Sequence, residues 1–298
     1  MRVFVTGATG FIGSAIVPEL INAGHQVLGL ARSEASANLL TAAGAEVQRG
    51  SLDDLDSLRM GAAASDGVIH AAYIHDFSDM AAASAADRGA IETIGAALAG
   101  SDRPFVVTSG TLFAAPGRPA TEEDPPALGP GSNPRAASEE LALALAARGV
   151  RASLVRLPLS VHGGGDHGFV PALIGIAREK GCSAYIGDGS NRWSAVHRLD
   201  AAHLFRLALE KGIAGARYHG IADEAVPVRE IAEIIARRLN VPVVSKSAEE
   251  AAAHFGWLGY FIGADGPASS KLTQERLGWH PTQPGLIADL DRMSYFGT

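Results

Sequence analysis

The fold of this chain is decided by its first stretch, Arg2-Val-Phe-Val-Thr-Gly-Ala-Thr-Gly-Phe-Ile-Gly13. Residues 2–6 form a short apolar run with β-branched side chains, which predicts a buried strand. Gly7, Gly10 and Gly13 then predict a tight turn into a helix over residues 14–23, because glycine lets the backbone approach a ligand closely. The N–H groups at the start of such a helix attract phosphate, so this order of elements predicts a dinucleotide site.

Strand and helix patterns alternate through the first half of the chain. Further strands are expected over residues 26–30, 45–48, 68–70, 105–108 and 151–156. Helices are expected over residues 34–43, 78–98 and 136–147, with a short helix that begins at residue 51. This alternation predicts an α/β protein with a doubly wound parallel sheet of the Rossmann type.

The alternation ends after Pro158. Helices are expected over residues 169–180, 200–211, 228–239, 248–255 and 286–293, with short extended pieces over residues 184–186, 192–197, 216–220 and 241–244. Such a mixed segment is where a substrate pocket closes over the carboxyl ends of the strands. We therefore expect a dinucleotide-binding domain over residues 1–160, which also takes in parts of 190–222, and a mainly substrate-binding segment over 161–298.

The composition narrows the class of protein. Hydrophobic residues make up 47% of the 298 residues and charged residues 19%, which suits a globular core. The net charge of −7 argues against a nucleic-acid surface, and the single cysteine, Cys182, excludes an internal disulfide. With no signal peptide and no membrane-length apolar stretch, we expect a cytoplasmic protein with no membrane or nucleic-acid partner.

The end of the second predicted strand bears on the choice of cofactor. An acidic residue there binds the ribose 2′-hydroxyl of NAD, whereas an arginine attracts the 2′-phosphate of NADP. Residues 29–33 contain no carboxylate, and Arg32 and Ser33 offer a guanidinium fork and a hydroxyl. We therefore predict NADP as the cofactor; the alternative is an exposed arginine with no ligand.

Several later stretches add to the glycine-rich loop. They are Val-Ile-His-Ala-Ala at 68–72, Val-Val-Thr-Ser-Gly-Thr at 106–111, Arg-Leu-Pro at 156–158 with Val-His-Gly at 161–163, and the segments 193–200 and 277–281. Together they resemble the extended and atypical short-chain dehydrogenases/reductases, the family of sugar epimerases and dehydratases. The resemblance spans essentially the whole chain and implies an NADP-dependent oxidoreductase that acts on a small carbonyl or alcohol substrate.

The resemblance and the strand ends together give the expected site residues. The expected cofactor-binding residues are Gly7, Thr9, Gly10, Phe11, Ile12, Gly13, Ala31, Arg32, Ser33, Ser51, Leu52, Ala71, Ala72, Tyr73, Thr108 and Pro158. The expected catalytic residues are Ser109 and Thr111 at the end of the fifth strand, with Tyr73 and His75 after the fourth. These four carry hydroxyl or imidazole groups that can bind a carbonyl oxygen or pass a proton to it.

The helix after the fifth strand departs from the family pattern. The family uses Tyr and Lys four residues apart, but Arg135 and Glu139 stand at those positions, and no tyrosine of the chain has a lysine four residues on. Arginine stays protonated and cannot act as a general acid, although it can stabilise an oxyanion. We interpret Arg135 and Glu139 as an i,i+4 ion pair on a helix surface. The alternatives are that Arg135 binds an oxyanion and that Glu139 binds the hydroxyls of a ribose.

The missing Tyr and Lys keep a second function open, that of a non-catalytic NADP-binding protein with a redox-sensing or structural role. The complete nucleotide loop, the Ser109 and Thr111 strand end and the C-terminal segment favour the enzyme. Residues 162–167 hold two histidines and an aspartate among glycines, but they align with a family loop, and we predict no metal site.

Two expectations concern larger surfaces. Trp193, Trp257, Tyr260 and Phe261 are candidates for an apolar pocket or for ordinary core packing. The resemblance also implies a possible homodimer through the helices over residues 78–98 and 136–147, whose Ala-rich faces permit close packing.

Overall fold

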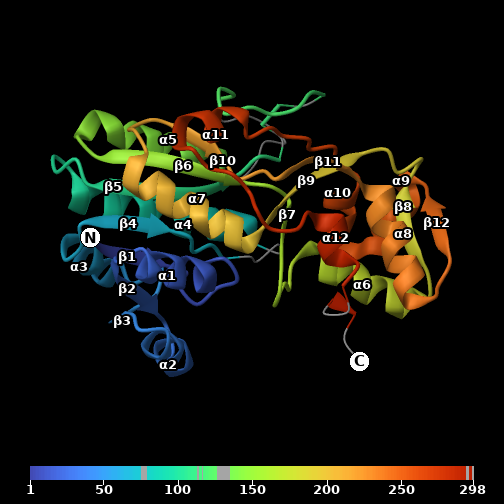
Figure 1. Ribbon diagram of the computed structural model, residues 1–298, viewed down its shortest axis with the longest axis horizontal. Helices are drawn as coiled ribbons and strands as arrows, with labels where there is room; N and C mark the ends of the chain where they lie inside the picture. The colour runs from blue at the N-terminus through green and yellow to red at the C-terminus, as the bar shows by residue number, and fades with distance from the viewer. Residues whose placement is uncertain (75–78, 113, 116, 126–134, 293–294, 297–298) are drawn as a thin grey trace.

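A computed structural model describes residues 1–74, 79–112, 114–115, 117–125, 135–292 and 295–296 (Figure 1). Its largest unit is a seven-stranded, fully parallel sheet with the strand order β10-β6-β5-β4-β1-β2-β3. The strands are β1 (Arg2–Thr6), β2 (Gln26–Ala31), β3 (Glu46–Arg49), β4 (Gly67–His70), β5 (Pro104–Gly110), β6 (Arg151–Leu157) and β10 (Arg217–His219). The predicted doubly wound α/β fold is confirmed.

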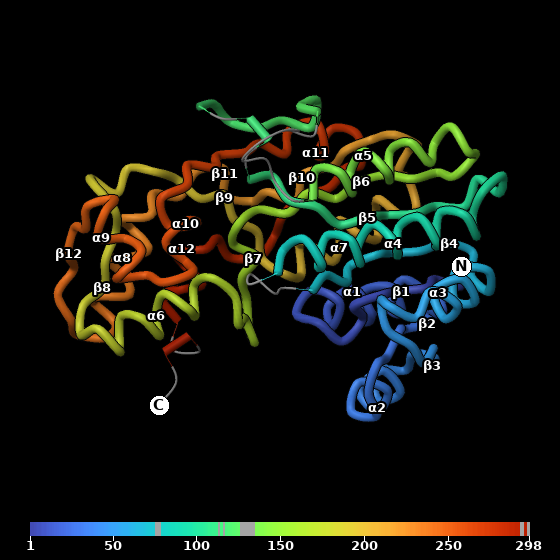
Figure 2. Tube along the Cα trace, turned by 180° about the vertical axis from the view of Figure 1, so that it is seen from behind, coloured from blue at the N-terminus to red at the C-terminus, as the bar shows by residue number. Residues whose placement is uncertain are grey.

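Helices cover both faces of this sheet. Figure 2 shows α3 (Leu55–Ala63), α4 (Met80–Leu98) and α5 (Ala136–Ala144) on one face. The other face carries α1 (Gly13–Asn22), α2 (Glu34–Ala42) and α7 (Arg198–Lys211), seen in Figure 1. Strand β1 serves both layers, because Val3 and Val5 pack on the α1 and α7 side and Phe4 packs on the α3 and α4 side. This alternation is the period of two that a strand buried on both faces requires.

The strand order reverses between β1 and β4, and this reversal positions the site. In open α/β sheets, ligands bind outside the carboxyl ends of the strands at such a switch point. The backbones come very close there: a Cβ on Gly7 would lie 2.7 Å from the amide nitrogen of Ala72. The carboxyl ends of the strands face the second lobe of the molecule (Figure 1).

The second lobe has its own small sheets. Strands β7 (Ser160–His162), β9 (Arg192–His197) and β11 (Asp223–Pro227) form one, and β8 (Ser183–Ile186) pairs with β12 (Val243–Lys246) in the other. The remaining helices are α6 (Phe169–Lys180), α8 (Val228–Leu239), α9 (Ala248–Phe255), α10 (Gly259–Ile262), α11 (Lys271–Leu277) and α12 (Leu286–Leu290). Two short 3-10 turns, η1 (Leu145–Arg148) and η2 (Gly256–Leu258), complete the list.

The elements that sequence patterns missed are short. Strand β7 has three residues and β11 five, too few to show a period, and α11 lies in a segment without a clear apolar stripe. The helix expected from residue 51 begins at Leu55, because Asp54 is its N-cap and accepts a hydrogen bond from the amide of Ser57.

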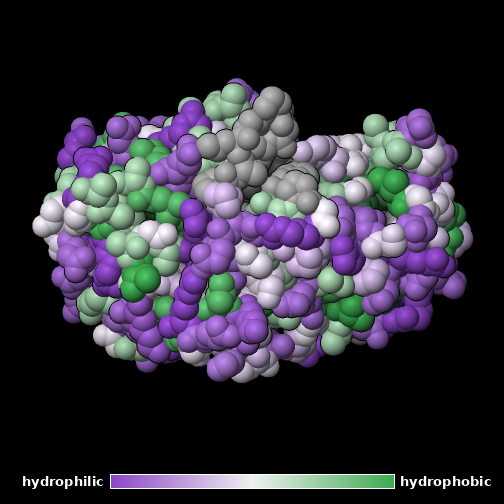
Figure 3. Space-filling model, turned by 90° about the horizontal axis from the view of Figure 1, so that it is seen from above, coloured by the Kyte–Doolittle hydropathy of each residue, from purple (hydrophilic) through white to green (hydrophobic). Residues whose placement is uncertain are grey.

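The described helices include none long and apolar enough to cross a membrane. On the face drawn in Figure 3, the described hydrophobic residues form small separate groups among hydrophilic ones.

Candidate active site

The loop between β1 and α1 fits the phosphates of a dinucleotide. A Cβ on Gly13 would lie 1.9 Å from the carbonyl oxygen of Gly7, so the loop can pack this tightly only with glycine there. Gly7 has φ +68°, and its carbonyl accepts a hydrogen bond of 2.9 Å from the amide of Gly10. The N-cap of α1, Ile12, supplies no side-chain cap, which leaves the positive end of the helix to a ligand.

The other expected cofactor residues follow the carboxyl ends of neighbouring strands. Arg32 and Ser33 come directly after β2, and Arg32 is exposed. Ser33 is the N-cap of α2 and accepts a hydrogen bond from the amide of Ser36, so part of its bonding capacity is already used. Ala31 is the last residue of β2, and Thr108 lies near the end of β5. The remaining predicted residues lie just beyond the ends of β3, β4 and β6: Ser51, Leu52, Ala71, Ala72 and Pro158. Their contact with a cofactor stays a prediction.

The interpretation of Arg135 and Glu139 as an exposed i,i+4 pair is wrong. Arg135 turns inward at the start of α5, with its side chain only 16% exposed. Its guanidinium donates a 2.6 Å hydrogen bond to the carbonyl oxygen of Thr108 and lies 4.4 Å from the centre of the Tyr73 ring. Its nearest described carboxylate is that of Asp87 on α4, at 3.9 Å. Arg135 therefore stands at the carboxyl ends of β4 and β5.

Glu139 is likewise buried, one turn further along α5. It binds Arg156 of β6, whose Nε donates to both carboxylate oxygens at 3.1 Å while Nη2 donates to one of them at 2.5 Å. Arg156 also donates a 2.9 Å hydrogen bond from Nη1 to the carbonyl oxygen of Asp124. Both side chains are fully buried, so their charges must be paired with each other. Both carboxylate oxygens of Glu139 bind Arg156 of β6, so Glu139 is not a ribose ligand.

Asp87 anchors a chain of buried polar groups behind Arg135. Its carboxylate shares a 3.1 Å hydrogen bond with Nε2 of His70, and Nδ1 of His70 lies 2.7 Å from the hydroxyl of Thr6. Burial alone would raise the pKa of Asp87, but the hydrogen bond with His70 and the charge of Arg135 hold that pKa below its ordinary value. The carboxylate is therefore ionised at neutral pH and balances the guanidinium. The sequence analysis assigned no site role to Asp87, inside a helix, or to His70, inside a strand.

Three of the four expected catalytic residues, Ser109, Thr111 and Tyr73, lie at or just beyond the carboxyl ends of β4 and β5. The Ser109 hydroxyl is buried, and no described residue forms a hydrogen bond with it. The Thr111 hydroxyl lies 3.4 Å from the carbonyl of Leu157, and the Tyr73 hydroxyl lies 3.4 Å from that of Ser84 on α4. Tyr73 thus presents the face of its ring to Arg135. His75 lies outside the described residues.

The glycine-rich loop after β7 lies beside the nucleotide loop. The rings of His167 and Phe11 meet edge to face at 5.6 Å, and the guanidinium of Arg198 lies 5.3 Å from the Phe11 ring. No described carboxylate forms an ion pair with Arg198, which the sequence analysis did not assign to the cofactor. His162 is buried and bonded to Asp289 at 2.9 Å. Among the described residues, no three metal-binding side chains gather around one point.

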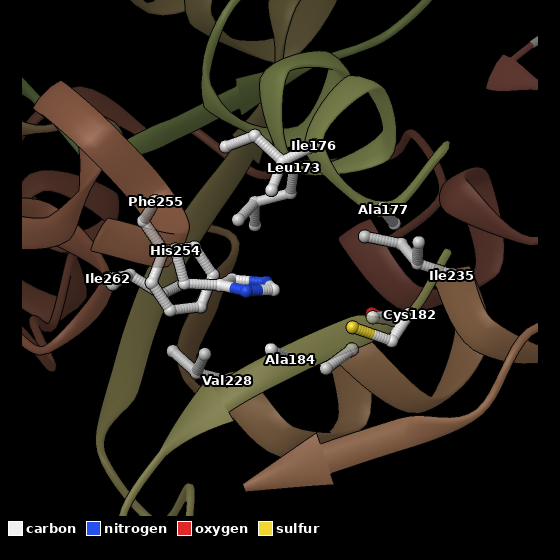
Figure 4. Close-up of a pocket in the computed structure, with 12 residues that line it drawn as sticks. Leu173, Ile176, Ala177, Cys182, Ala184, Val228, Ile235, His254, Phe255 and Ile262 are labelled. Carbon is white, nitrogen blue, oxygen red and sulfur yellow. The ribbon is translucent and has the colours of Figure 1, made fainter. Parts of the chain in front are cut away.

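A small pocket in the second lobe lies elsewhere. It is enclosed by α6, β8, α8 and α9, with Leu173, Val228, His254 and Phe255 among its mostly apolar walls (Figure 4). All its lining residues fall between Leu173 and Ile262, and none comes from the main sheet or its loops. This pocket is therefore not the site of cofactor chemistry.

Comparison with known proteins identifies the family. The profile of the NAD dependent epimerase/dehydratase family matches residues 3–220. The chain belongs to this family. As a member of the epimerase/dehydratase family, it is an NAD(P)-dependent enzyme that uses a pyridine nucleotide cofactor, and its resemblance to short-chain dehydrogenases/reductases is confirmed.

The chain is similar to several known proteins in sequence and to solved structures in fold. The uncharacterized protein C2A9.02 of Schizosaccharomyces pombe is 52% identical over 99% of this chain and 100% of its own length. The sterol-4-alpha-carboxylate 3-dehydrogenase (decarboxylating) of Dictyostelium discoideum is 32% identical over 77% of this chain and 74% of its own. The solved dTDP-glucose 4,6-dehydratase DesIV of Streptomyces venezuelae shares the fold, with a TM-score of 0.79 at 21% identity over 99% of this chain and 97% of its own.

The nucleotide loop gives a first testable prediction. Gly13→Ala places a Cβ against the Gly7 carbonyl, so the loop must open and affinity for NADPH should fall by about tenfold or more. The matched control is Gly175→Ala, at an exposed position of α6 where a Cβ meets nothing within 4 Å. Isothermal titration of NADPH into each variant measures the effect. Equal affinities in wild type and Gly13→Ala would contradict the assignment of the loop.

The ion pair between Glu139 and Arg156 gives a second prediction. Glu139→Leu leaves a buried guanidinium unpaired and should lower the free energy of unfolding by about 3–5 kcal/mol, measured by urea denaturation. The double variant Glu139→Leu/Arg156→Met should recover much of that loss, because no unpaired charge remains. Glu34→Leu, which breaks the exposed pair with Arg49, is the control and should cost less than about 1 kcal/mol. A loss for Glu139→Leu no larger than the control would refute the pairing.

Proposed function

We propose that this chain is an NADPH-dependent reductase of a small carbonyl substrate, or the dehydrogenase of the corresponding alcohol, in which Arg135 binds the substrate oxygen. The observation that carries this proposal is the position of Arg135. Its guanidinium stands at the carboxyl ends of β4 and β5, at the position that the family resemblance gives to the tyrosine. Within the proposed division, residues 1–160 hold the nucleotide and residues 161–298 mainly the substrate.

A fixed guanidinium suits this reaction. When bound, the pyridine nucleotide supplies or accepts a hydride at the substrate carbon. Negative charge then develops on the carbonyl oxygen, and a donor that is already oriented stabilises this charge without reorganising. Arg135 is oriented by three neighbours: the Thr108 carbonyl, the Tyr73 ring and the Asp87 carboxylate. Its planar guanidinium carries five N–H donors, one of which binds the Thr108 carbonyl.

The proton must come from another group, because arginine keeps its own near neutral pH. The proposed candidates are Ser109, Thr111, Tyr73 and His75, with water as the ultimate source. Support for Ser109 comes from its buried hydroxyl, which forms no hydrogen bond with a described residue and is the neighbour of Thr108 in β5. A serine hydroxyl is a weak acid alone, so Ser109 would pass a proton on rather than generate one.

Asp87 is proposed as the positioning residue for Arg135. It is 1% exposed and ionised, so it supplies the negative charge that a partly buried arginine needs. His70 and Thr6 in turn fix the carboxylate through a hydrogen-bonded chain that ends at the start of the nucleotide loop. The oxyanion donor and the cofactor loop are thereby tied to one rigid set of buried groups.

The choice of NADP rests on the end of β2. Arg32 is exposed there, and the nearest acidic residue in sequence, Glu34, is engaged with Arg49 at 2.5 Å. A 2′-phosphate would meet the Arg32 fork and no free carboxylate. Arg198 is proposed as a second cation toward the cofactor, since it lies against Phe11 of the nucleotide loop. The cytoplasmic location and the homodimer through α4 and α5 stay predictions.

Replacement of Arg135 tests the catalytic proposal. Arg135→Met should lower kcat for a ketone substrate by about a hundredfold or more, the usual cost of removing an oxyanion donor, while the dissociation constant of NADPH stays within about twofold. Asp87→Asn should lower kcat less, and Arg59→Met, which removes an exposed guanidinium on α3, should leave kcat unchanged. Steady-state NADPH oxidation provides the measurement.

Unchanged turnover in Arg135→Met would contradict the role of Arg135. Tight NADPH binding without turnover of any carbonyl by wild type would instead favour the non-catalytic redox-sensing function.

Replacement of Arg32 tests the cofactor preference. Arg32→Ala removes a charge-assisted contact with the 2′-phosphate and should raise the KM for NADPH by about tenfold to a hundredfold. The KM for NADH should not change, because NADH has no phosphate at that position. The same assay run with both nucleotides gives the result. A wild-type preference for NADH would overturn the assignment.

A further inference from the structure

The loop between β7 and α6, residues 163–168, lies against the nucleotide loop, and we call it the strap. Its His167 ring meets the Phe11 ring edge to face at 5.6 Å. The strap is also bonded to itself, because the amide of Asp166 donates a 3.0 Å hydrogen bond to the carbonyl oxygen of Gly163. The strap is therefore a folded turn that contacts the predicted cofactor site.

Arg198, at the start of α7, lies between the strap and the nucleotide loop. Its guanidinium is 5.3 Å from the centre of the Phe11 ring. On the other side, a Cβ on Gly165 would lie 3.7 Å from Nη1 of Arg198, and a Cβ on Gly163 would lie 3.2 Å from its Cγ. No carboxylate in the described part of the chain forms an ion pair with this guanidinium. Phe11 directly precedes Ile12, the N-cap of α1, so Arg198 adds a positive charge beside the helix end that attracts phosphate.

The C-terminal segment binds the strap through one hydroxyl. The Tyr295 hydroxyl accepts a 2.8 Å hydrogen bond from the amide of Gly163 and lies 3.4 Å from a carboxylate oxygen of Asp166 and from one of Asp289. Burial raises the pKa of Tyr295, and the charges of the two carboxylates raise it further. The hydroxyl therefore keeps its proton and can donate it to a carboxylate while it accepts from Gly163.

Both ends of the strap are joined to the core of the second lobe. His162, the last residue of β7, binds Asp289 of α12 at 2.9 Å, and these side chains are only 0% and 5% exposed. At the other end, Phe169 of α6 packs edge to face against the fully buried ring of Trp193 at 6.0 Å. Trp193 is therefore a core residue. The ends of the strap are fixed, and the bond with Tyr295 sets the position of the residues between them.

We infer that Arg198 binds the diphosphate of the pyridine nucleotide and that Tyr295 is the positioning residue that holds the strap, and with it Arg198, against the nucleotide loop. A guanidinium suits this ligand, because its paired N–H donors match two phosphate oxygens. The inference rests on the nucleotide-binding part of the proposed function and adds that the C-terminal segment controls how long the cofactor stays bound. It does not depend on Arg32, because NAD and NADP share the diphosphate.

The rate of NADPH release tests the role of Tyr295 without any substrate. Tyr295→Phe keeps the ring but removes the acceptor of the Gly163 amide, so release should become about threefold to tenfold faster. Stopped-flow fluorescence of NADPH during displacement by excess NADP⁺ gives the rate. The matched control is Tyr185→Phe, which removes from β8 a hydroxyl for which the described residues provide no hydrogen bond. Equal release rates in wild type and Tyr295→Phe would overturn the inference.

A double-mutant cycle separates positioning from a general loss of stability. Arg198→Met should raise the dissociation constant of NADPH by about tenfold or more through the lost charge-assisted contact. In that background, Tyr295→Phe should speed release by less than about twofold, because the strap no longer positions a cation. A merely structural role for Tyr295 predicts the same effect in both backgrounds, and that result would refute the coupling.

Two neighbouring glycines provide an independent test of the strap. Gly163 has φ +132°, and a Cβ there would lie 2.8 Å from Nε2 of His197, so Gly163→Ala must displace the strap and should speed NADPH release. Gly164 is exposed, and a Cβ there meets nothing within 4 Å, so Gly164→Ala should release NADPH at the wild-type rate. Equal rates in the two variants would contradict the inference. If Gly163→Ala does not fold, Tyr295→Phe still decides.

The proposals fail in different ways. If wild type reduces no ketone while Tyr295→Phe speeds nucleotide release, the reductase function fails and the strap stands. If wild type prefers NADH, the cofactor assignment fails, and the strap must then produce the same differences in rate with NADH. If ketones are reduced and Tyr295→Phe releases the nucleotide at the wild-type rate, the reductase function stands and the strap is refuted.

Discussion

The buried carboxylate of Glu139 on α5 and the partly buried guanidinium of Arg135 at its N-cap fix the active-site side of this molecule. Glu139 is paired with Arg156 of β6, and Arg135, one turn earlier, faces Asp87 of α4. A charge removed from water is tolerated only when an opposite charge or strong hydrogen bonds compensate it. Because both partners belong to other elements, the rotation of α5 is set by the sheet and by α4. The same rotation brings the Arg135 guanidinium to the strand ends.

The fold was predictable because its signals are local. Strand β1, helix α6 and helix α8 begin and end where apolar periodicity, glycine and proline place them. The error at Arg135 and Glu139 has the opposite origin. The i,i+4 rule compares residues on one helix surface, whereas their true partners lie 17 residues away in β6 and 48 residues away in α4. No sequence pattern showed that α5 turns these charges inward.

The candidate site was predictable only in part for the same reason. Residues at strand ends, such as Arg32, Thr108 and Ser109, follow from topology, since parallel strands end at one edge of the sheet. No role was predicted for Asp87 or His70, because a sequence pattern does not show which residues surround a side chain inside a helix or a strand.

The central claim is that Arg135 takes the place of the usual acid by binding the substrate oxygen. A crystal structure of the complex with NADP⁺ and the alcohol product of a ketone that the wild type reduces tests it most directly. We expect the alcohol oxygen within hydrogen-bonding distance of the Arg135 guanidinium, with Asp87 still beside Arg135. A complex in which the guanidinium binds only the cofactor, with the alcohol oxygen held by other groups, would contradict the account.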